Sequence, residues 1–254
     1  MAKIGEQWHS VLSKKLDFDP GGVIPVYLYP NRRAFADAIG AKPDESVVGM
    51  AHTRTLKVRI DASNTLARIE SIVPHELVHV FLSRRLKAFT PRMPLWMHEG
   101  LAKYLTGDWS PGDAELLREI GTSGRIIPLN RISHVFPQDE KQRAIAYVES
   151  YSIVSFMAKK YGPECIPDFL AELSAGNPFP TALEYSIGVR PEKLEEEWRQ
   201  YLWDEYGLDR WIRFGSATVS FLMAFFAILA FRARRLMKRR KVAELEEEFH
   251  EEYK

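Results

Sequence analysis

The chain has 254 residues, of which 46% are hydrophobic and 27% are charged, so it is long enough and apolar enough to bury a sizeable core. Its 35 Lys and Arg residues nearly balance its 34 Asp and Glu residues, which excludes the strong overall positive charge typical of a nucleic-acid-binding protein. The single cysteine, Cys165, excludes an intrachain disulfide and leaves the redox compartment open.

The first quarter of the chain predicts a small sheet. Strand-forming residues fill Val23–Tyr29, Val47–His52 and Thr55–Ile60, and the last of these segments alternates apolar with polar side chains. Between the first two strands, Arg32–Ile39 has the pattern of a short helix, which Gly40 would end. We therefore expect the domain to open with a strand followed by a helix.

From Leu66 to Leu86 the apolar pattern becomes helical, with Asp61 and Ser63 as candidate N-terminal caps. Pro74 falls inside this segment and predicts either a kink or the start of a new helix. The rest of the domain predicts helices separated by Gly, Pro, Asn or Ser, at Leu95–Leu105, Gly112–Ile120, Gln138–Tyr161, Glu164–Ser174, Phe179–Tyr185 and Pro191–Tyr206. This order, a small N-terminal sheet and then a helical lobe, is that of an α+β fold.

One apolar run stands apart near the C-terminus. Phe214–Phe231 contains 18 residues without a charge, which at about 1.5 Å per residue just spans a hydrocarbon core of about 30 Å. A helix packed at the edge of a globule would carry a polar stripe, and this run has none. We therefore expect a folded domain at 1–209, a transmembrane helix in the lipid bilayer at 210–232 and a charged juxtamembrane tail at 233–254.

The charges on either side of this run predict an orientation. Seven Lys or Arg residues lie in Arg232–Lys241, so the positive-inside rule puts the C-terminus in the cytoplasm and the folded domain outside it. Met1–Ser10 contains no apolar run long enough for a signal peptide. Two arrangements remain open: a start that lies upstream, or a tail anchor with the folded domain in the cytoplasm.

The residues with the clearest chemical meaning lie in the second predicted helix, at Leu66–Leu86, which reads His-Glu-Leu-Val-His at 75–79. Residues four apart share one face of a helix, so His75 and His79 can bind one zinc ion while Glu76 reaches a water molecule. A catalytic zinc site needs three protein ligands and an open position, and it lowers the pKa of the water. The alternative is a chance motif whose histidines form ordinary hydrogen bonds, and a third ligand would decide between the two.

Glu99 is the candidate for that third ligand. It lies twenty positions after His79, in the helical segment Trp96–Tyr104, and a proline-containing loop separates the two helices. Two antiparallel helices joined in this way can bring Glu99 to the metal. His98 is the alternative, because imidazole is also a good zinc ligand.

The motif at 75–79, together with Trp-Met-His-Glu-Gly-Leu-Ala at 96–102, resembles the gluzincin metallopeptidases. That group includes thermolysin and the aminopeptidase N type, and the chain is most similar to its small peptidase MA-like members, as far as about Gly162. The resemblance implies that Glu99 rather than His98 is the third zinc ligand. It also implies an endopeptidase, because the chain lacks the Gly-x-Met-x-Asn type of motif with which the aminopeptidase N type holds a free amino terminus.

Two further roles follow from the resemblance. Ala146–Met157 is similar to the family's tyrosine-containing helix, which implies that the Tyr147 hydroxyl donates to the oxyanion, with Tyr151 as the alternative one turn on. Both could instead be amphipathic core tyrosines. The strand Val47–His52 occupies the place of the family's edge strand, which pairs with extended substrate, although an ordinary strand would have the same sequence.

The chain departs from thermolysin-like members at Lys103, one turn after Glu99, where they carry an acid that supports a histidine ligand. Support for the histidines must therefore come from elsewhere. With that reservation, the sequence predicts a membrane-anchored zinc peptidase in which zinc activates a water molecule, Glu76 acts as general base, and zinc and Tyr147 stabilise the oxyanion. The alternatives are an inactive membrane-tethered binding or scaffold protein, which would have no need of an intact Glu76, and a zinc hydrolase of another substrate.

Overall fold

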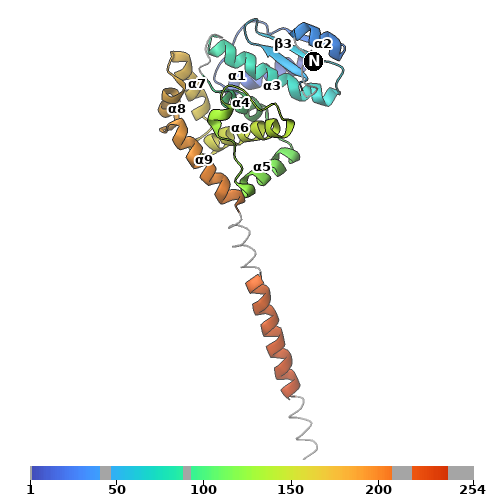
Figure 1. The fold of residues 1–254 in the computed structure, drawn as a ribbon, viewed down its shortest axis with the longest axis vertical. Coiled ribbons are helices and arrows are strands. Elements are labelled where there is room, and N and C mark those ends of the chain that lie inside the picture. The colour runs from blue at the N-terminus through green and yellow to red at the C-terminus, as the bar shows by residue number, and fades with distance from the viewer. Residues whose placement is uncertain (1, 41–46, 88–92, 208–218, 240–254) are drawn as a thin grey trace, which may run out of the picture. The chain divides into compact units, whose positions relative to one another are not determined.

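The computed structural model describes residues 2–40, 47–87, 93–207 and 219–239 of the chain. The chain divides into two units, Met1–Trp203 and Asp204–Lys254. In the first unit, a small sheet is followed by a long series of helices, which confirms the expected α+β class (Figure 1).

The sheet has three strands, β1 (Val26–Tyr29), β2 (Gly49–His52) and β3 (Lys57–Asp61), in the order β1-β3-β2. β3 runs parallel to β1 and antiparallel to β2, so that β1 and β2 form the two edges. Each strand overlaps a predicted one. Alternate residues of β3, Val58 and Ile60, have no exposed surface, as expected for a strand with one face on the core.

Helix α1 (Ala2–Lys15) precedes the sheet, so the expectation that the domain opens with a strand was wrong. The signal for this helix is the spacing of Trp8, Leu12 and Leu16, which recur every four residues. Leu12 and Leu16 are fully buried, and α1 packs against α3. The apolar contacts that hold α1 in place therefore come from a distant part of the chain.

Helix α2 (Arg32–Ile39) has the predicted bounds because both of its ends are marked by their residue types. The Asn31 side chain accepts a hydrogen bond from the Ala34 backbone N–H at the start. Gly40 ends the helix in the left-handed conformation, with a φ of 71° that residues with a β-carbon rarely adopt.

Helix α3 (Leu66–Arg85) is capped by Thr65, whose side chain accepts a hydrogen bond from the Arg68 backbone N–H. The prediction of Asp61 or Ser63 as the cap was wrong. The Asp61 carboxylate instead accepts hydrogen bonds from the backbone and the hydroxyl of Ser63, and so closes the turn between β3 and the helix.

The same helix runs through the middle of the first unit. It packs against β2 and β3, and also against α1 and α4. Pro74 lies within a continuous helix, so it does not start a new one. The segment His75–His79 follows directly and lies in the part of α3 that is buried on nearly every side, since all residues from Val73 to Ser83 are buried.

The helical lobe follows α3 and contains six α-helices and one short 3-10 helix within the described residues. Each α-helix lies within three residues of its predicted bounds, and only the 3-10 helix was not predicted. The elements are α4 (Leu95–Thr106), α5 (Pro111–Ser123), η1 (Leu129–Ile132), α6 (Glu140–Tyr161), α7 (Cys165–Ala175), α8 (Phe179–Ile187) and α9 (Pro191–Tyr206).

Helices α4 and α6 make the most extensive contact of the lobe. A β-carbon placed on Gly100 of α4 would lie 2.2 Å from the carbonyl oxygen of Ser150 in α6, so only glycine permits this approach. The close contact matters for the site, because α4 carries Glu99 and α6 carries Tyr147.

In the second unit, residues 219–239 form a helix with exposed large apolar side chains such as Phe221 and Phe226. The predicted transmembrane run begins at Phe214, and residues 214–218 lie outside the described part of the chain. Among the helices that the structure describes, none combines the length and the apolar character needed to cross a membrane.

Candidate metal centre

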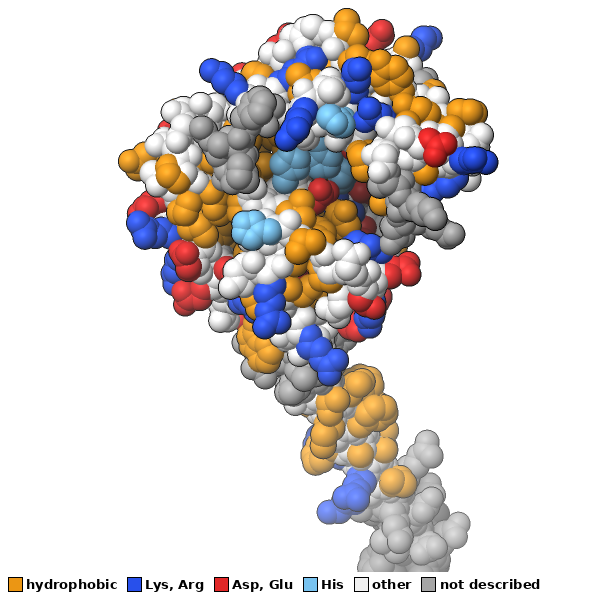
Figure 2. Space-filling view, turned by 45° about the horizontal axis from the view of Figure 1, so that its top comes forward, with side chains coloured by type: hydrophobic (Ala, Val, Ile, Leu, Met, Phe, Trp, Pro, Cys, Tyr) orange, Lys and Arg blue, Asp and Glu red, His pale blue; other side chains and the backbone are white. Residues whose placement is uncertain are grey.

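The motif on α3 presents three polar side chains in an otherwise apolar helix. His75, Glu76 and His79 expose only 8%, 7% and 8% of their surface, so they are nearly enclosed but can still be reached from outside. The rings of His75 and His79 lie 4.9 Å apart, centroid to centroid, with an angle of 80° between their planes. Figure 2 shows histidine side chains, with an acidic side chain beside them, gathered in a hollow of the molecular surface.

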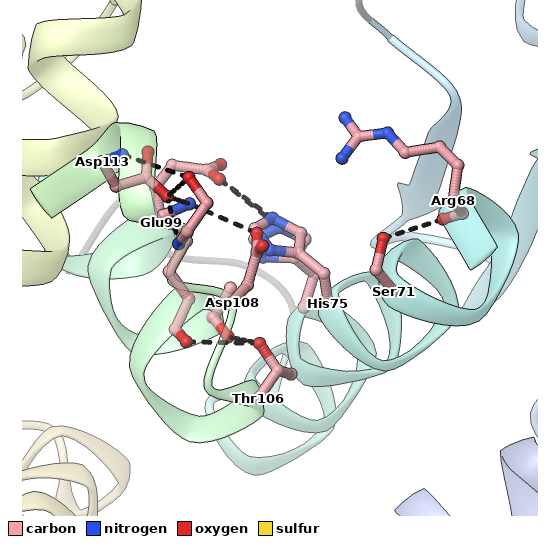
Figure 3. A network of polar contacts seen from close by, with 11 residues as sticks. Arg68, Ser71, His75, Glu99, Thr106, Asp108 and Asp113 are labelled. Carbon is pink, nitrogen blue, oxygen red and sulfur yellow. Dashed lines mark hydrogen bonds and ion pairs between the residues drawn. The ribbon is translucent and has the colours of Figure 1, made fainter. Parts of the chain in front are cut away.

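Glu99 on α4 points to the same place. Its Oε2 lies 3.3 Å from Nε2 of His75 and 3.7 Å from Nε2 of His79. Figure 3 shows the first of these contacts, with the Glu99 carboxylate directed at the His75 ring from the neighbouring helix. One ligand atom from each of the three residues lies within 4.8 Å of the other two, so the structure brings together the three predicted ligands.

This group fits a zinc ion in spacing, composition and charge. Ligand atoms that are each about 2 Å from one tetrahedral ion lie about 3 to 4 Å from one another, and the distances of 3.3 Å and 3.7 Å from Glu99 Oε2 to the two histidine nitrogens fall in this range. Burial raises the pKa of Glu99, but the neighbouring His79 and His75 outweigh it and lower the pKa to about 2, so the side chain is a carboxylate. Burial lowers the pKa of His79 to about 3, which leaves a neutral ring with a free lone pair. For His75, burial lowers the pKa, but the hydrogen bond to Glu99 and the negative charges of Glu99, Glu76 and Asp108 together outweigh it and raise the pKa.

Glu76 lies beside this group and receives support from the sheet. Burial is the main cause that raises its pKa to about 7, with the negative charge of Glu99 adding to it, while His75 and the Ala51 backbone N–H oppose the shift. A carboxyl with a pKa close to neutral is well suited to accept and return a proton. The hydrogen bond from Ala51 ties the side chain to the edge strand β2.

The two candidate tyrosines on α6 lie in different surroundings. Burial raises the pKa of Tyr147, and so do the negative charges of Glu99 and Glu76, so this phenol keeps its proton and lies near enough to both carboxylates for their charges to act on it. Tyr151 instead stacks on Trp109, with a centroid distance of 4.2 Å. Neither Glu76 nor Glu99 is among the causes that raise the pKa of Tyr151. Of the two tyrosines, Tyr147 is therefore the one on which the charges of Glu76 and Glu99 act, and its role as the oxyanion donor stays a prediction.

His98, the alternative ligand, does not belong to the group of three. Its ring lies against the ring of His79, and burial lowers its pKa, so it is neutral. Lys103 is buried and forms ion pairs with Asp108 at 3.3 Å and with Asp113 at 3.7 Å. This lysine therefore connects α4 to the start of α5. It offers no hydrogen-bond acceptor to the N–H groups of the histidine rings.

Residues 11–204 match the family model of the Peptidase MA superfamily. The chain belongs to the Peptidase MA superfamily. In this Peptidase MA protein the match begins in α1 and ends in α9, so it reaches further than the resemblance at the two motifs and the tyrosine helix. Comparison with curated proteins and with solved structures gives no significant match.

Two contributions to the site have no clear signal in the sequence. The first is the contact of β2 with Glu76, which is made by Gly49 and Ala51. A glycine followed two positions later by an alanine is common in strands, so this pair of residues does not predict the contact. The stacking of His98 on His79 likewise depends on how α3 and α4 are packed.

Proposed function

We propose that this Peptidase MA protein is a zinc-dependent peptidase that uses Glu76 as its general base. The observation that carries the proposal is the convergence of His75, His79 and Glu99 within 4.8 Å, with Glu76 beside them on the same helix as the two histidines. Two imidazole nitrogens and one carboxylate oxygen form a ligand set that zinc peptidases use, and it leaves a position open for substrate or water.

A zinc ion held by these residues would supply a Lewis acid that polarises the peptide carbonyl and makes a water molecule more acidic. Glu76 takes the proton from the attacking water, and its pKa of about 7 lets it pass that proton on to the leaving amine. The Tyr147 hydroxyl, which keeps its own proton, donates a hydrogen bond to the oxygen on which negative charge develops.

Substrate would bind as an extended strand along β2. This strand pairs only with β3 in the described sheet, so its other edge can form backbone hydrogen bonds, and it passes next to Glu76. Such binding depends on the peptide backbone and does not need a free terminus. It favours an endopeptidase that accepts unfolded or extended segments of proteins.

The proposal includes attachment to a membrane through 214–231. Its support is the uncharged run from Phe214 to Phe231 and the exposure of Phe221, Phe226 and Phe231 on the helix at 219–239. The basic residues that follow from Arg232 favour a cytoplasmic C-terminus and an extracytoplasmic catalytic domain.

The catalytic proposal is tested with the full chain in detergent. We expect about one zinc ion per chain, and cleavage of a denatured protein that a chelator abolishes and added zinc restores. Glu76→Gln should keep the zinc and lose nearly all cleavage, because an amide fills the same space but cannot accept the proton. Glu70→Gln, an exposed residue of the same helix, serves as the control and should cleave like wild type.

If Glu76→Gln cleaved as well as the wild type, the mechanism would be contradicted. If the wild-type protein cleaved nothing, the alternative of an inactive binding or scaffold protein would be favoured. The membrane part is tested separately, by adding protease to intact cells or spheroplasts. The catalytic domain should be degraded. Protection of that domain, with the C-terminal tail accessible instead, would reverse the proposed orientation.

A further inference from the structure

The histidines of the metal group lack the usual support. A metal-binding histidine normally donates its second ring N–H to a carboxylate or a carbonyl, which fixes the orientation of the ring. Here the Nδ1 atoms of both His75 and His79 are buried, and no group in the described part of the chain forms a hydrogen bond with either atom. The orientation of these rings must therefore be held by packing.

For His79, two neighbouring histidine rings supply packing contacts. The His98 ring lies face to face with the His79 ring, with a centroid distance of 4.6 Å and an angle of 9° between the planes. His75 meets the same ring edge-on, at 4.9 Å and 80°. A ring that is stacked on one neighbour and in T-shaped contact with another can neither tilt nor rotate freely, so these contacts can replace a hydrogen bond as the orienting interaction.

The parallel arrangement also separates His98 from the ligands. The lone pair of an imidazole nitrogen lies in the plane of the ring, so two rings that bind one ion must have planes that converge on it. His75 and His79 satisfy this condition, because their planes are nearly perpendicular and a nitrogen of each lies within 4.8 Å of the same carboxylate oxygen. The rings of His98 and His79 lie in nearly parallel, separate planes, so their lone pairs stay in those planes and do not converge on one ion.

We propose that His98 is a positioning residue that orients the His79 ring for the metal by stacking on its face. The inference rests on the proposed zinc site and adds a role for a residue outside it. His98 precedes Glu99 on α4, so one turn of that helix supplies both a ligand and the support of a ligand on α3. The shape of the aromatic ring matters for this role, and its nitrogen atoms do not.

This distinction defines the experiment. Full-length wild type, His98→Ala and His98→Phe are titrated with zinc in competition with a chromogenic chelator, and the visible spectra of the cobalt-loaded proteins are recorded. Loss of an orienting contact typically costs about tenfold to a hundredfold in metal affinity. We expect such a loss, with a changed cobalt spectrum, in His98→Ala. We expect His98→Phe to recover the wild-type spectrum and to bind zinc within about threefold of wild type, because phenyl stacks in the same way.

His134→Ala is the control, since His134 is an exposed histidine that does not belong to the metal group, and it should bind zinc like wild type. Equal affinity of His98→Ala and wild type would overturn the proposal. So would a His98→Phe protein that binds as weakly as His98→Ala, because a nitrogen atom would then be required. Failure of the wild-type protein itself to bind zinc would refute the proposed function, and the inference with it, and is a separate outcome of the same titration.

Discussion

Gly49 of β2 lies directly against Glu76 of α3. A β-carbon at position 49 would be 2.9 Å from the Cγ atom of Glu76 and 3.0 Å from a methyl group of Ile72, which is closer than side chains tolerate. The strand can approach Glu76 only because residue 49 has no side chain. This contact, together with the hydrogen bond from Ala51, sets the position of the carboxyl group.

Gly49→Ala should therefore displace Glu76 and lower kcat without removing the metal. A misplacement of about 1 Å in a reacting group can cost about a hundredfold in rate, so we expect a loss of about tenfold to a hundredfold. Steady-state kinetics and zinc content provide the measurement. Gly5→Ala, at a glycine with no atom within 4 Å of an added β-carbon, should behave as wild type. Unchanged kcat in Gly49→Ala would show that the contact does not position the base.

Tyr147→Phe should reduce kcat by about a hundredfold or more and leave KM nearly unchanged, because its hydroxyl is used mainly in the transition state. Tyr151→Phe is the matched control, one turn further along α6, where the ring stacks on Trp109. It should retain most of the activity. The opposite order in the two kcat values would assign the oxyanion donor to Tyr151.

Gly100→Ala should destabilise the fold, because the new methyl group would lie 2.2 Å from the backbone oxygen of Ser150, and backbone cannot move aside as a side chain can. Overpacking of this kind typically costs about 1 to 3 kcal/mol in the free energy of unfolding. Gly112→Ala, where the nearest atom is an ordinary 3.6 Å away, should be nearly neutral. Equal stability of the two variants in chemical denaturation would mean that α4 and α6 can separate without cost.

Glu149 predicts a pH dependence of stability. It is fully buried, its Oε1 accepts a hydrogen bond of 3.0 Å from the Ile127 backbone N–H, and its Oε2 has no partner among the described residues. Burial raises its pKa from 4.5 to about 8, so between these values the folded protein holds a proton that the unfolded chain has lost. The free energy of unfolding should then fall as pH rises through this range, by up to about 1.4 kcal/mol per pH unit.

Glu149→Gln cannot ionise and should lack this part of the pH dependence, so that its stability relative to wild type increases from pH 5 to pH 8. Urea denaturation at several pH values in this range measures the effect. Glu140→Gln, an exposed residue at the start of the same helix, should keep the wild-type slope. A Glu149→Gln protein with the wild-type slope would assign the pH dependence to other groups.

Much of the fold could be predicted from local patterns. The helices α2, α4 and α9 begin where predicted, because capping residues, prolines and apolar spacing act within a few neighbouring residues. Helix α1 was missed because it is short of apolar residues, and what holds it is contact with α3, more than fifty residues away. The cap of α3 was misplaced for a similar reason, since Asp61, Ser63 and Thr65 are all suitable residue types and the geometry of the turn selects Thr65.

The sequence by itself determined that His75 and His79 share one helical face, with Glu76 between them in the chain, because residues four apart always lie on the same face of an α-helix. Only the tertiary structure shows that Glu99 rather than His98 lies with the two histidines, and that the charges of Glu76 and Glu99 act on Tyr147 rather than on Tyr151. Each pair lies within one turn of a single helix, and which member faces the metal group depends on how α4 and α6 are rotated about their axes against α3. That rotation follows from packing across the unit, such as the approach of Gly100 to Ser150, and no local pattern encodes it.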